Sequence, residues 1–255
     1  MDFDQKEQTE IKFWQNTTFS DSGDPFQSIS MTGWPTIINR MVEAQVFIEK
    51  LHAFDRFFGP AKTVLELGGG QCWASCMVKV ANPSAHVTGT DIAPSAVDAI
   101  PIWERIFNVK LDRSLACKSY DTGLSAGSFD LIFAFSSAHH FGRYRQTLRE
   151  ISRLLKPDGA VLFLHEPACP PIWYPLAKWR MDRRSYGVPE DVLLTGKLRK
   201  FSAEFGMTTD VIMAPTLTSG GPIQSIYYLG LKTVPLLQRV MPCSVDLLFR
   251  RGGGY

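Results

Sequence analysis

One short segment, residues 63–97, limits most strongly what this chain can fold into. It begins with an apolar run, TVLEL, continues with a glycine triplet in ELGGGQC, and then reads as a helix, WASCMVKVA, and a second strand, AHVTGTD. Glycine lets the backbone approach a ligand closely, and the start of the following helix directs N–H groups toward that ligand. The segment therefore predicts a strand-turn-helix nucleotide site.

Strands and helices continue to alternate after this segment. The strand-like runs are SLACKSYD, SFDLIFAFSS and GAVLFLHE, and the helical patterns between them are PSAVDAIPIWERIF and YRQTLREISRLL. Continuous apolar strands are typical of parallel sheets that are covered on both faces. A helix, GKLRKFSAEFG, and two strands, MTTDVIMAP and PIQSIYYLGLK, would complete the sheet. We therefore expect an α/β fold with a doubly wound sheet.

The chain divides into three parts on this interpretation. Residues 1–60 form an N-terminal arm and a helix that cap the ligand site, residues 61–232 form the ligand-binding domain, and residues 233–255 form a C-terminal extension. Residues 167–195 contain five prolines and interrupt the alternation, so we expect a lid inserted after the fifth strand. Seven aromatic residues could make an apolar cover for a flat or lipid-like ligand: Phe13, Trp14, Phe19, Trp34, Trp173, Tyr174 and Trp179.

Composition and charge limit the partners. The net charge of +2 and the lack of a basic-aromatic stripe give no reason to expect nucleic acid. Residues 176–255 are basic, with eleven Lys and Arg against six Asp and Glu, and could meet an anionic molecule or contact a membrane peripherally. No apolar run reaches the roughly 18 residues of a membrane span, and the N-terminus does not resemble a targeting peptide.

The five cysteines show no disulfide framework, which favours a reducing compartment and a soluble, cytoplasmic protein. Cys72 and Cys76 could bind a metal ion or arsenic with Cys117 and Cys169. Burial as small apolar side chains is the favoured interpretation, so we expect no metal site.

Acids at two strand ends narrow the identity of the nucleotide. Glu66 ends the first strand, and Asp91 ends the second strand, 21 positions after Gly70, where a carboxylate accepts the hydroxyls of an adenosine ribose. A nicotinamide dinucleotide fingerprint would need a small residue at the position of Trp73, and no Gly-Lys-Ser/Thr follows the glycines as in a P-loop. The sequence therefore favours an adenosine cofactor that is not a dinucleotide.

From about Thr63 to Lys232 the chain resembles the class I S-adenosylmethionine (SAM)-dependent methyltransferases. ELGGGQC resembles their first motif, an acid followed by GxGxG, with Cys72 where a third glycine is usual. GTDIAPSAV, SYDTGLSAGSFD, SFDLIFAFSSAHHF and EISRLLKPDGAVLFLHE resemble the later motifs in the right order. Within this family the chain most resembles the ubiquinone and menaquinone C-methyltransferases and the sugar and natural-product methyltransferases. The resemblance implies a Rossmann-like sheet of seven strands whose last strand is antiparallel.

The resemblance also implies which residues hold SAM. Gly68 and Gly70 would face the methionine portion, Asp91 the ribose, Ile92 one face of the adenine and Asp121 its amine. Ser136 and Ser137, after the fourth strand, would lie beside the transferring methyl group. The full set of expected cofactor-binding residues is Glu66, Gly68, Gly69, Gly70, Asp91, Ile92, Tyr120, Asp121, Ser136 and Ser137.

Four residues at the ends of the fourth and fifth strands are candidates for catalysis. They are His139, His140, His165 and Glu166. Each could remove a proton from an acceptor hydroxyl or phenol-like carbon, whereas one histidine of the adjacent pair could instead pack structurally.

We therefore expect an enzyme of small-molecule biosynthesis that transfers a methyl group from SAM to an O or C atom of a natural product, quinone-like molecule or sugar. The alternative is a catalytically silent methyltransferase-like protein that acts in assembly or binding, and a dehydrogenase comes third. The chain could form a homodimer.

Overall fold

The strands of the computed structural model form one mixed sheet in the order β3-β2-β1-β4-β5-β7-β6. The structure describes residues 2–18, 34–184, 190–216 and 222–252. The strands are β1 (Thr63–Glu66), β2 (His86–Asp91), β3 (Arg113–Ala116), β4 (Phe129–Phe135), β5 (Leu155–Ala168), β6 (Met207–Met213) and β7 (Cys243–Arg251). The first five run parallel to one another, and β7 is antiparallel to both β5 and β6. The predicted seven-stranded Rossmann-like sheet with an antiparallel last strand is confirmed.

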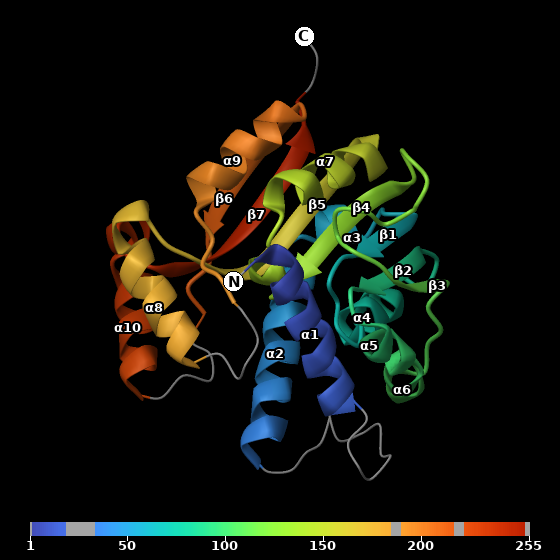
Figure 1. Ribbon diagram of the computed structural model, residues 1–255, viewed down its shortest axis with the longest axis horizontal. Coiled ribbons are helices and arrows are strands. Elements are labelled where there is room, and N and C mark those ends of the chain that lie inside the picture. The colour runs from blue at the N-terminus through green and yellow to red at the C-terminus, as the bar shows by residue number, and fades with distance from the viewer. Residues whose placement is uncertain (1, 19–33, 185–189, 217–221, 253–255) are drawn as a thin grey trace.

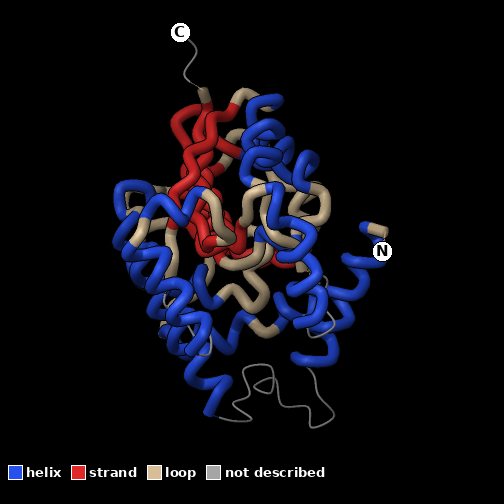
Figure 2. Tube along the Cα trace, turned by 90° about the vertical axis from the view of Figure 1, so that its left-hand side faces the viewer, coloured by secondary structure: helices blue, strands red, loops and turns tan. Residues whose placement is uncertain are grey.

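Helices cover both faces of this sheet (Figures 1 and 2). They are α1 (Phe3–Thr18), α2 (Trp34–Ala53), α3 (Asp55–Phe58), α4 (Trp73–Ala81), α5 (Pro94–Asp98), α6 (Ile100–Phe107), α7 (Tyr144–Leu154), α8 (Tyr174–Arg184), α9 (Thr195–Glu204) and α10 (Pro222–Thr233). Short 3-10 helices are η2 (Ala138–His140), η3 (Pro171–Trp173) and η4 (Pro235–Arg239).

Alternation along the strands sorts the core into two layers. On β4, Leu131 and Phe133 pack with α2, α4 and α6, whereas Ile132 and Ala134 pack with α7 and α9. Successive strand residues point to opposite faces, and both faces here are buried, which explains the continuous apolar run in the sequence.

The sheet order reverses at β1. The chain moves outward from β1 to β2 and β3, and then returns to place β4 on the other side of β1. Ligands bind outside the carboxyl ends of the strands at such a switch point. The edge between β1 and β4 is therefore where the fold predicts a site.

The C-terminal part of the chain differs from the prediction. The segment expected as the strand PIQSIYYLGLK is the helix α10, and the last strand is β7, beyond residue 232 where we expected the domain to end. Pro222 starts this helix well, because a proline at the first turn loses no hydrogen bond. The run CSVDLLF is buried between β5 and β6, so it belongs to the sheet rather than to an extension.

The insertion after β5 contains η3 and α8, and the lid that we expect there stays a prediction. Figure 1 shows α8 beside α10 beyond β6 and β7, on the side of the molecule opposite α4 to α6.

Among the residues that the structure describes, no helix combines the length and the apolar character needed to cross a bilayer.

Candidate active site

A cavity of about 290 Å³ lies at the carboxyl ends of β1 and β4. Its walls come from the loop after β1, from the loops after β2, β3 and β4, from α1, and from Glu43 of α2. Small-molecule pockets measure about 300–1,000 Å³, so this cavity is near the lower limit. The cavity lies at the switch point that the sheet order predicts.

The glycine loop after β1 turns through left-handed backbone conformations. Gly68 has φ +65°, Gly70 has φ +56° and Cys72, which is not a glycine, has φ 54°. The Cys72 side chain fits because it lies against Gly89 of β2, where an added Cβ would come within 2.8 Å of the cysteine Sγ. A glycine on the neighbouring strand thus makes room for the residue that replaces the third glycine of the motif.

Glu66 supports this loop from within the protein. Its Oε2 accepts hydrogen bonds from the Ser75 N–H at 3.0 Å and the Ser75 hydroxyl at 2.5 Å. A Cβ on Gly69 would come within 2.6 Å of the Glu66 carboxyl carbon, so the loop lies directly on this carboxyl group. Burial raises the pKa of Glu66 to about 7, although the bonds from Ser75 oppose the shift. Glu66 also contributes to the cavity wall.

Asp91 joins the glycine loop to the end of β2. Its Oδ2 accepts a hydrogen bond from the Gly70 N–H at 2.8 Å, and its Oδ1 accepts one from the Ala93 N–H at 2.9 Å. Burial raises the pKa of this carboxyl group to about 6. A carboxylate can accept about four hydrogen bonds, so each oxygen keeps capacity for a ligand hydroxyl in the cavity.

Acidic groups dominate the charge of the cavity. Its lining contains five carboxyl side chains against a single lysine: Glu7, Glu10, Glu43, Glu66 and Asp91, with Lys6. Such a wall favours a cationic ligand and opposes the pyrophosphate of a dinucleotide.

Of the residues expected near the adenine, two line the cavity and one does not. Ile92 and Tyr120 line the cavity, together with Cys117 and Ser119 after β3. The Asp121 side chain is exposed and is not part of the lining. The chain turns after Tyr120 and directs the next residue outward, so the assignment of Asp121 to the adenine is not supported.

Helix α1 covers the cavity with aromatic side chains. The Trp14 ring lies over Gly70, where an added Cβ would be 2.8 Å from its Cζ2. The Phe3 ring lies over Gly142, where an added Cβ would be 2.6 Å from its Cδ1. Phe13 also lines the cavity. Glycines at both contacts let the helix approach the loops closely.

Polar contacts hold α1 in this place. Glu7 accepts a hydrogen bond from the Tyr120 hydroxyl at 2.7 Å and pairs with Lys118 at 2.9 Å and Arg143 at 3.4 Å. Arg143 also pairs with Asp4 at 2.5 Å. The residues Phe3, Glu7, Glu10 and Trp14 recur at a spacing of three or four positions, which places them on one face of the helix.

The loop after β4 also lines the cavity. Ser136, with φ 47°, and Ser137 line it, and so does His140 of η2. The His140 Nδ1 lies 3.4 Å from the Glu10 Oε2 on α1. Of the four residues predicted for catalysis, His140 is the one that reaches the cavity.

The other three predicted catalytic residues lie behind the cavity wall. Glu166 is fully buried and accepts hydrogen bonds from the N–H groups of Ser137, Ala138 and His139, and its Oε2 lies 2.8 Å from His139 Nδ1. These donors hold the pKa of Glu166 below its usual value despite burial. Glu166 and His139 therefore support the loop and do not line the cavity.

His165 contacts the far side of Phe135. Its ring stacks on Phe135 with centroids 5.9 Å apart, and its Nδ1 lies 3.1 Å from the Thr216 hydroxyl. Burial lowers the pKa of this imidazole. Phe135 lines the cavity, and His165 packs behind it, so the structure does not support His165 as a base.

The aromatic cover differs in part from the prediction. Phe13 and Trp14 line the cavity, whereas Trp173, Tyr174 and Trp179 do not. Phe19 lies outside the described residues, and so does the side chain of Trp34. The sequence reasoning missed Glu10 and Phe141, although Glu10 shares a helix face with Trp14 in the printed sequence.

A sequence model and several solved structures of methyltransferases resemble this chain. Residues 65–163 match the sequence model of a methyltransferase domain. No curated protein has significant sequence similarity to the chain. The geranyl diphosphate C-methyltransferase of Streptomyces coelicolor A3(2), in complex with Mg²⁺, geranyl diphosphate and S-adenosyl-L-homocysteine, superposes with a TM-score of 0.68. The match covers 96% of this chain and 98% of that enzyme at 14% identity.

Two further solved structures contain S-adenosyl-L-homocysteine. Magnesium protoporphyrin IX methyltransferase of Synechocystis PCC 6803 has a TM-score of 0.61 and 14% identity, over 96% of this chain and 99% of its own. The O-methyltransferase of a trans-AT PKS multienzyme of Brevibacillus brevis has a TM-score of 0.58 and 14% identity, over 86% and 76% of the two chains. At this identity the structural likeness establishes the fold.

Proposed function

We propose that this chain, whose residues 65–163 match the sequence model of a methyltransferase domain, is a class I SAM-dependent enzyme that methylates an oxygen or carbon atom of a small organic molecule. One observation carries the proposal. The buried Asp91 carboxylate, joined to the Gly70 N–H at 2.8 Å, and His140 line the same cavity. The residues that we propose for the cofactor and for the acceptor thus line the same cavity.

The residues at the cofactor end fit SAM. Asp91 accepts the ribose hydroxyls with the capacity that its two backbone bonds leave free. Gly68 and Gly70 let the backbone approach the methionine portion, and Ile92 packs against the adenine. The acidic lining suits the sulfonium and ammonium groups of the cofactor, and it explains why a dinucleotide is disfavoured.

SAM supplies a methyl group that is already activated by the sulfonium. The protein therefore has to align the acceptor with the carbon–sulfur bond and keep water out, and alignment alone contributes roughly 7–11 kcal/mol in well-oriented systems. Ser136 and Ser137 border the acceptor, and α1 excludes water through Phe13 and Trp14. His140 promotes loss of the acceptor proton.

Calorimetric titration of the purified full chain tests the proposal, with SAM, S-adenosylhomocysteine and NAD as the three ligands. We expect micromolar binding of SAM and its demethylated product, and no binding of NAD. Small hydroxylated and phenolic acceptors would then be screened for SAM-dependent methylation by mass spectrometry. Failure to bind SAM and its product would contradict the proposal and favour a catalytically silent binding protein.

A further inference from the structure

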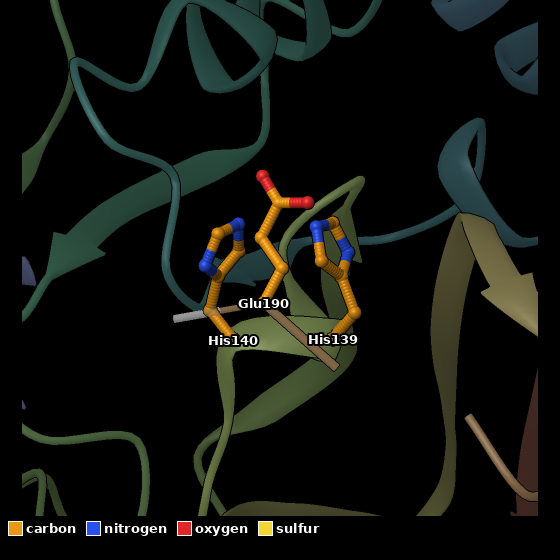
Figure 3. A group of neighbouring side chains, drawn as sticks. All are labelled: His139, His140 and Glu190. Carbon is orange, nitrogen blue, oxygen red and sulfur yellow. The ribbon is translucent and has the colours of Figure 1, made fainter. Parts of the chain in front are cut away.

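Two histidines and a glutamate meet beside the part of the cavity wall that His140 forms. His139 and His140 of η2 and Glu190 each offer one ligand atom, and these atoms lie within 4.8 Å of one another. Figure 3 shows the two imidazole rings on either side of the Glu190 carboxylate. The ring centroids are 4.2 Å apart. Glu190 comes from the segment after α8, so the spacing of these residues in the sequence does not reveal the cluster.

Each imidazole has a carboxylate near Nδ1, at hydrogen-bond distance for His139 and at ion-pair distance without a hydrogen bond for His140. His139 Nδ1 lies 2.8 Å from Glu166 Oε2, and His140 Nδ1 lies 3.4 Å from Glu10 Oε2. The Nε2 atoms therefore remain for a ligand on the other side of each ring. Histidines that bind metals usually give their second nitrogen to a carboxylate or carbonyl, which fixes the tautomer and the ring orientation.

The backbone holds the cluster on both sides. The Glu166 carboxylate fixes η2 through three N–H groups, as described above. The Asp191 N–H donates to the His139 carbonyl oxygen at 3.1 Å, and the Asp191 carboxylate accepts a hydrogen bond from the Tyr174 hydroxyl at 2.9 Å. Glu190 is therefore attached to η2 through its neighbour. Ligand atoms on one zinc ion lie roughly 3.3 Å apart, which a rotation of the half-buried Glu190 side chain can reach.

We propose that His139, His140 and Glu190 bind a divalent transition metal ion of the zinc class, with one position open to an oxygen of the methyl acceptor. Two imidazoles and a carboxylate are a ligand set of catalytic zinc sites, which keep such a position open. His140 belongs to both the cluster and the cavity wall, whereas His139 and Glu190 lie outside the lining, so the ion would lie next to the wall that the acceptor meets. The inference rests on the proposed function and specifies its acceptor as an oxygen-bearing molecule.

The ion explains how His140 promotes proton loss. Coordination lowers the pKa of the acceptor hydroxyl, its O–H bond breaks, and the proton passes to solvent water. The oxygen then forms a bond to the methyl carbon while the carbon–sulfur bond of SAM breaks and its electron pair stays on sulfur. The products are the methyl ether, S-adenosylhomocysteine and one proton, so no oxidant or reductant is needed.

The test is zinc binding by the full chain after metal removal with a chelator. We expect a single equivalent of Zn²⁺ by calorimetry. Glu190→Gln and His140→Ala should each weaken that binding by about tenfold or more. Cobalt(II) in place of zinc should give visible bands without the charge-transfer absorption of a thiolate. His52→Ala, which removes an exposed histidine of α2, should bind zinc as the wild type does.

The outcomes separate the metal site from the proposed function. Absence of zinc binding, equal affinity in Glu190→Gln and the wild type, or thiolate absorption from cobalt would each overturn the metal site. Binding of S-adenosylhomocysteine is measured on the same samples and should persist in Glu190→Gln, which lies outside the cavity lining. A chain that binds zinc but not S-adenosylhomocysteine would contradict the proposed function and with it the acceptor role of the ion.

Discussion

The Glu166 carboxylate holds the His139 ring at 2.8 Å and accepts three backbone N–H groups of the loop after β4 at the same time. Four donors on one buried carboxylate leave it no free side for an acceptor molecule. The sequence places Glu166 at the end of a strand, as expected for a catalytic acid, but the structure uses it to fix the loop that carries His140. Glu166 therefore has a positioning role, and the proposed catalytic role belongs to His140.

Glu166→Gln should destabilise the fold. An amide has one oxygen where the carboxylate has two, and its NH₂ group would face N–H donors in a fully buried site. We expect the free energy of unfolding in urea to fall by about 3 kcal/mol. Glu204→Gln removes an exposed partner of Arg145 and should cost less than about 1 kcal/mol. Equal losses in the two variants would contradict the supporting role of Glu166.

Glu66→Gln should change how stability depends on pH. Because burial raises the pKa of Glu66 from 4.5 to about 7, the folded state binds this proton more tightly than the unfolded state does. Wild-type stability from this group is full below pH 4.5 and declines as the pH rises to 7, by about 3 kcal/mol. The glutamine variant has no such proton. Urea unfolding at pH 5 and pH 8 should show a smaller decline for the variant, and parallel curves would rule out the shift.

The sequence predicted the parts of the site that depend on local geometry. The glycine loop, the acids at the ends of β1 and β2, and the buried strands follow from spacing and turn chemistry, and they lie where expected. Spacing and turn chemistry cannot show which of two adjacent residues, His139 or His140, lines the cavity. Whether a ring of η2 points to the cavity or to Glu166 depends on a strand contributed by a distant part of the chain.

Long-range packing also explains the other differences. The run CSVDLLF has an ordinary strand composition, but only its place between β5 and β6 makes it a central strand. The segment PIQSIYYLGLK is rich in residues that favour strands, yet β7 occupies the antiparallel position between β5 and β6, and the segment is helical. The position of α1 over Gly70 depends on charges of Lys118 and Arg143 that are far from Glu7 in the sequence.

Asp91→Ala should weaken SAM binding by at least about tenfold, or about 1.4 kcal/mol, since the ribose loses its carboxylate. The SAM affinity of the wild type should also depend on pH, because it depends on the ionisation of Asp91. Ionised Asp91 accepts hydroxyl protons, and protonation below its pKa of about 6 removes this capacity. Affinity should therefore fall roughly tenfold between pH 7 and pH 5.

Calorimetry at both pH values tests the role of Asp91, with circular dichroism to show that Asp91→Ala stays folded. Asp98→Ala, an exposed acid of the neighbouring helix α5, is the matched control and should keep both the affinity and its pH dependence. Unchanged SAM affinity in Asp91→Ala would remove Asp91 from the cofactor site.

Glu7→Ala should speed both the entry and the release of SAM. The cavity measures about 290 Å³ and the Trp14 ring lies over Gly70, so α1 has to move outward before a cofactor and an acceptor can enter. Glu7 holds α1 through Tyr120 and Lys118. Loss of about 1 kcal/mol of partly exposed contacts would raise the open fraction, and both rate constants, about fivefold while the dissociation constant changes little.

Stopped-flow tryptophan fluorescence during mixing with SAM measures these rates. Because the contacts are ionic, higher salt should accelerate the wild type and have less effect on Glu7→Ala. Glu49→Ala removes an exposed acid of α2 and serves as the control, with rates equal to those of the wild type. If Glu7→Ala and Glu49→Ala bind SAM at the same rates, α1 does not gate the cavity, and the cofactor must enter by a route that leaves Trp14 on Gly70.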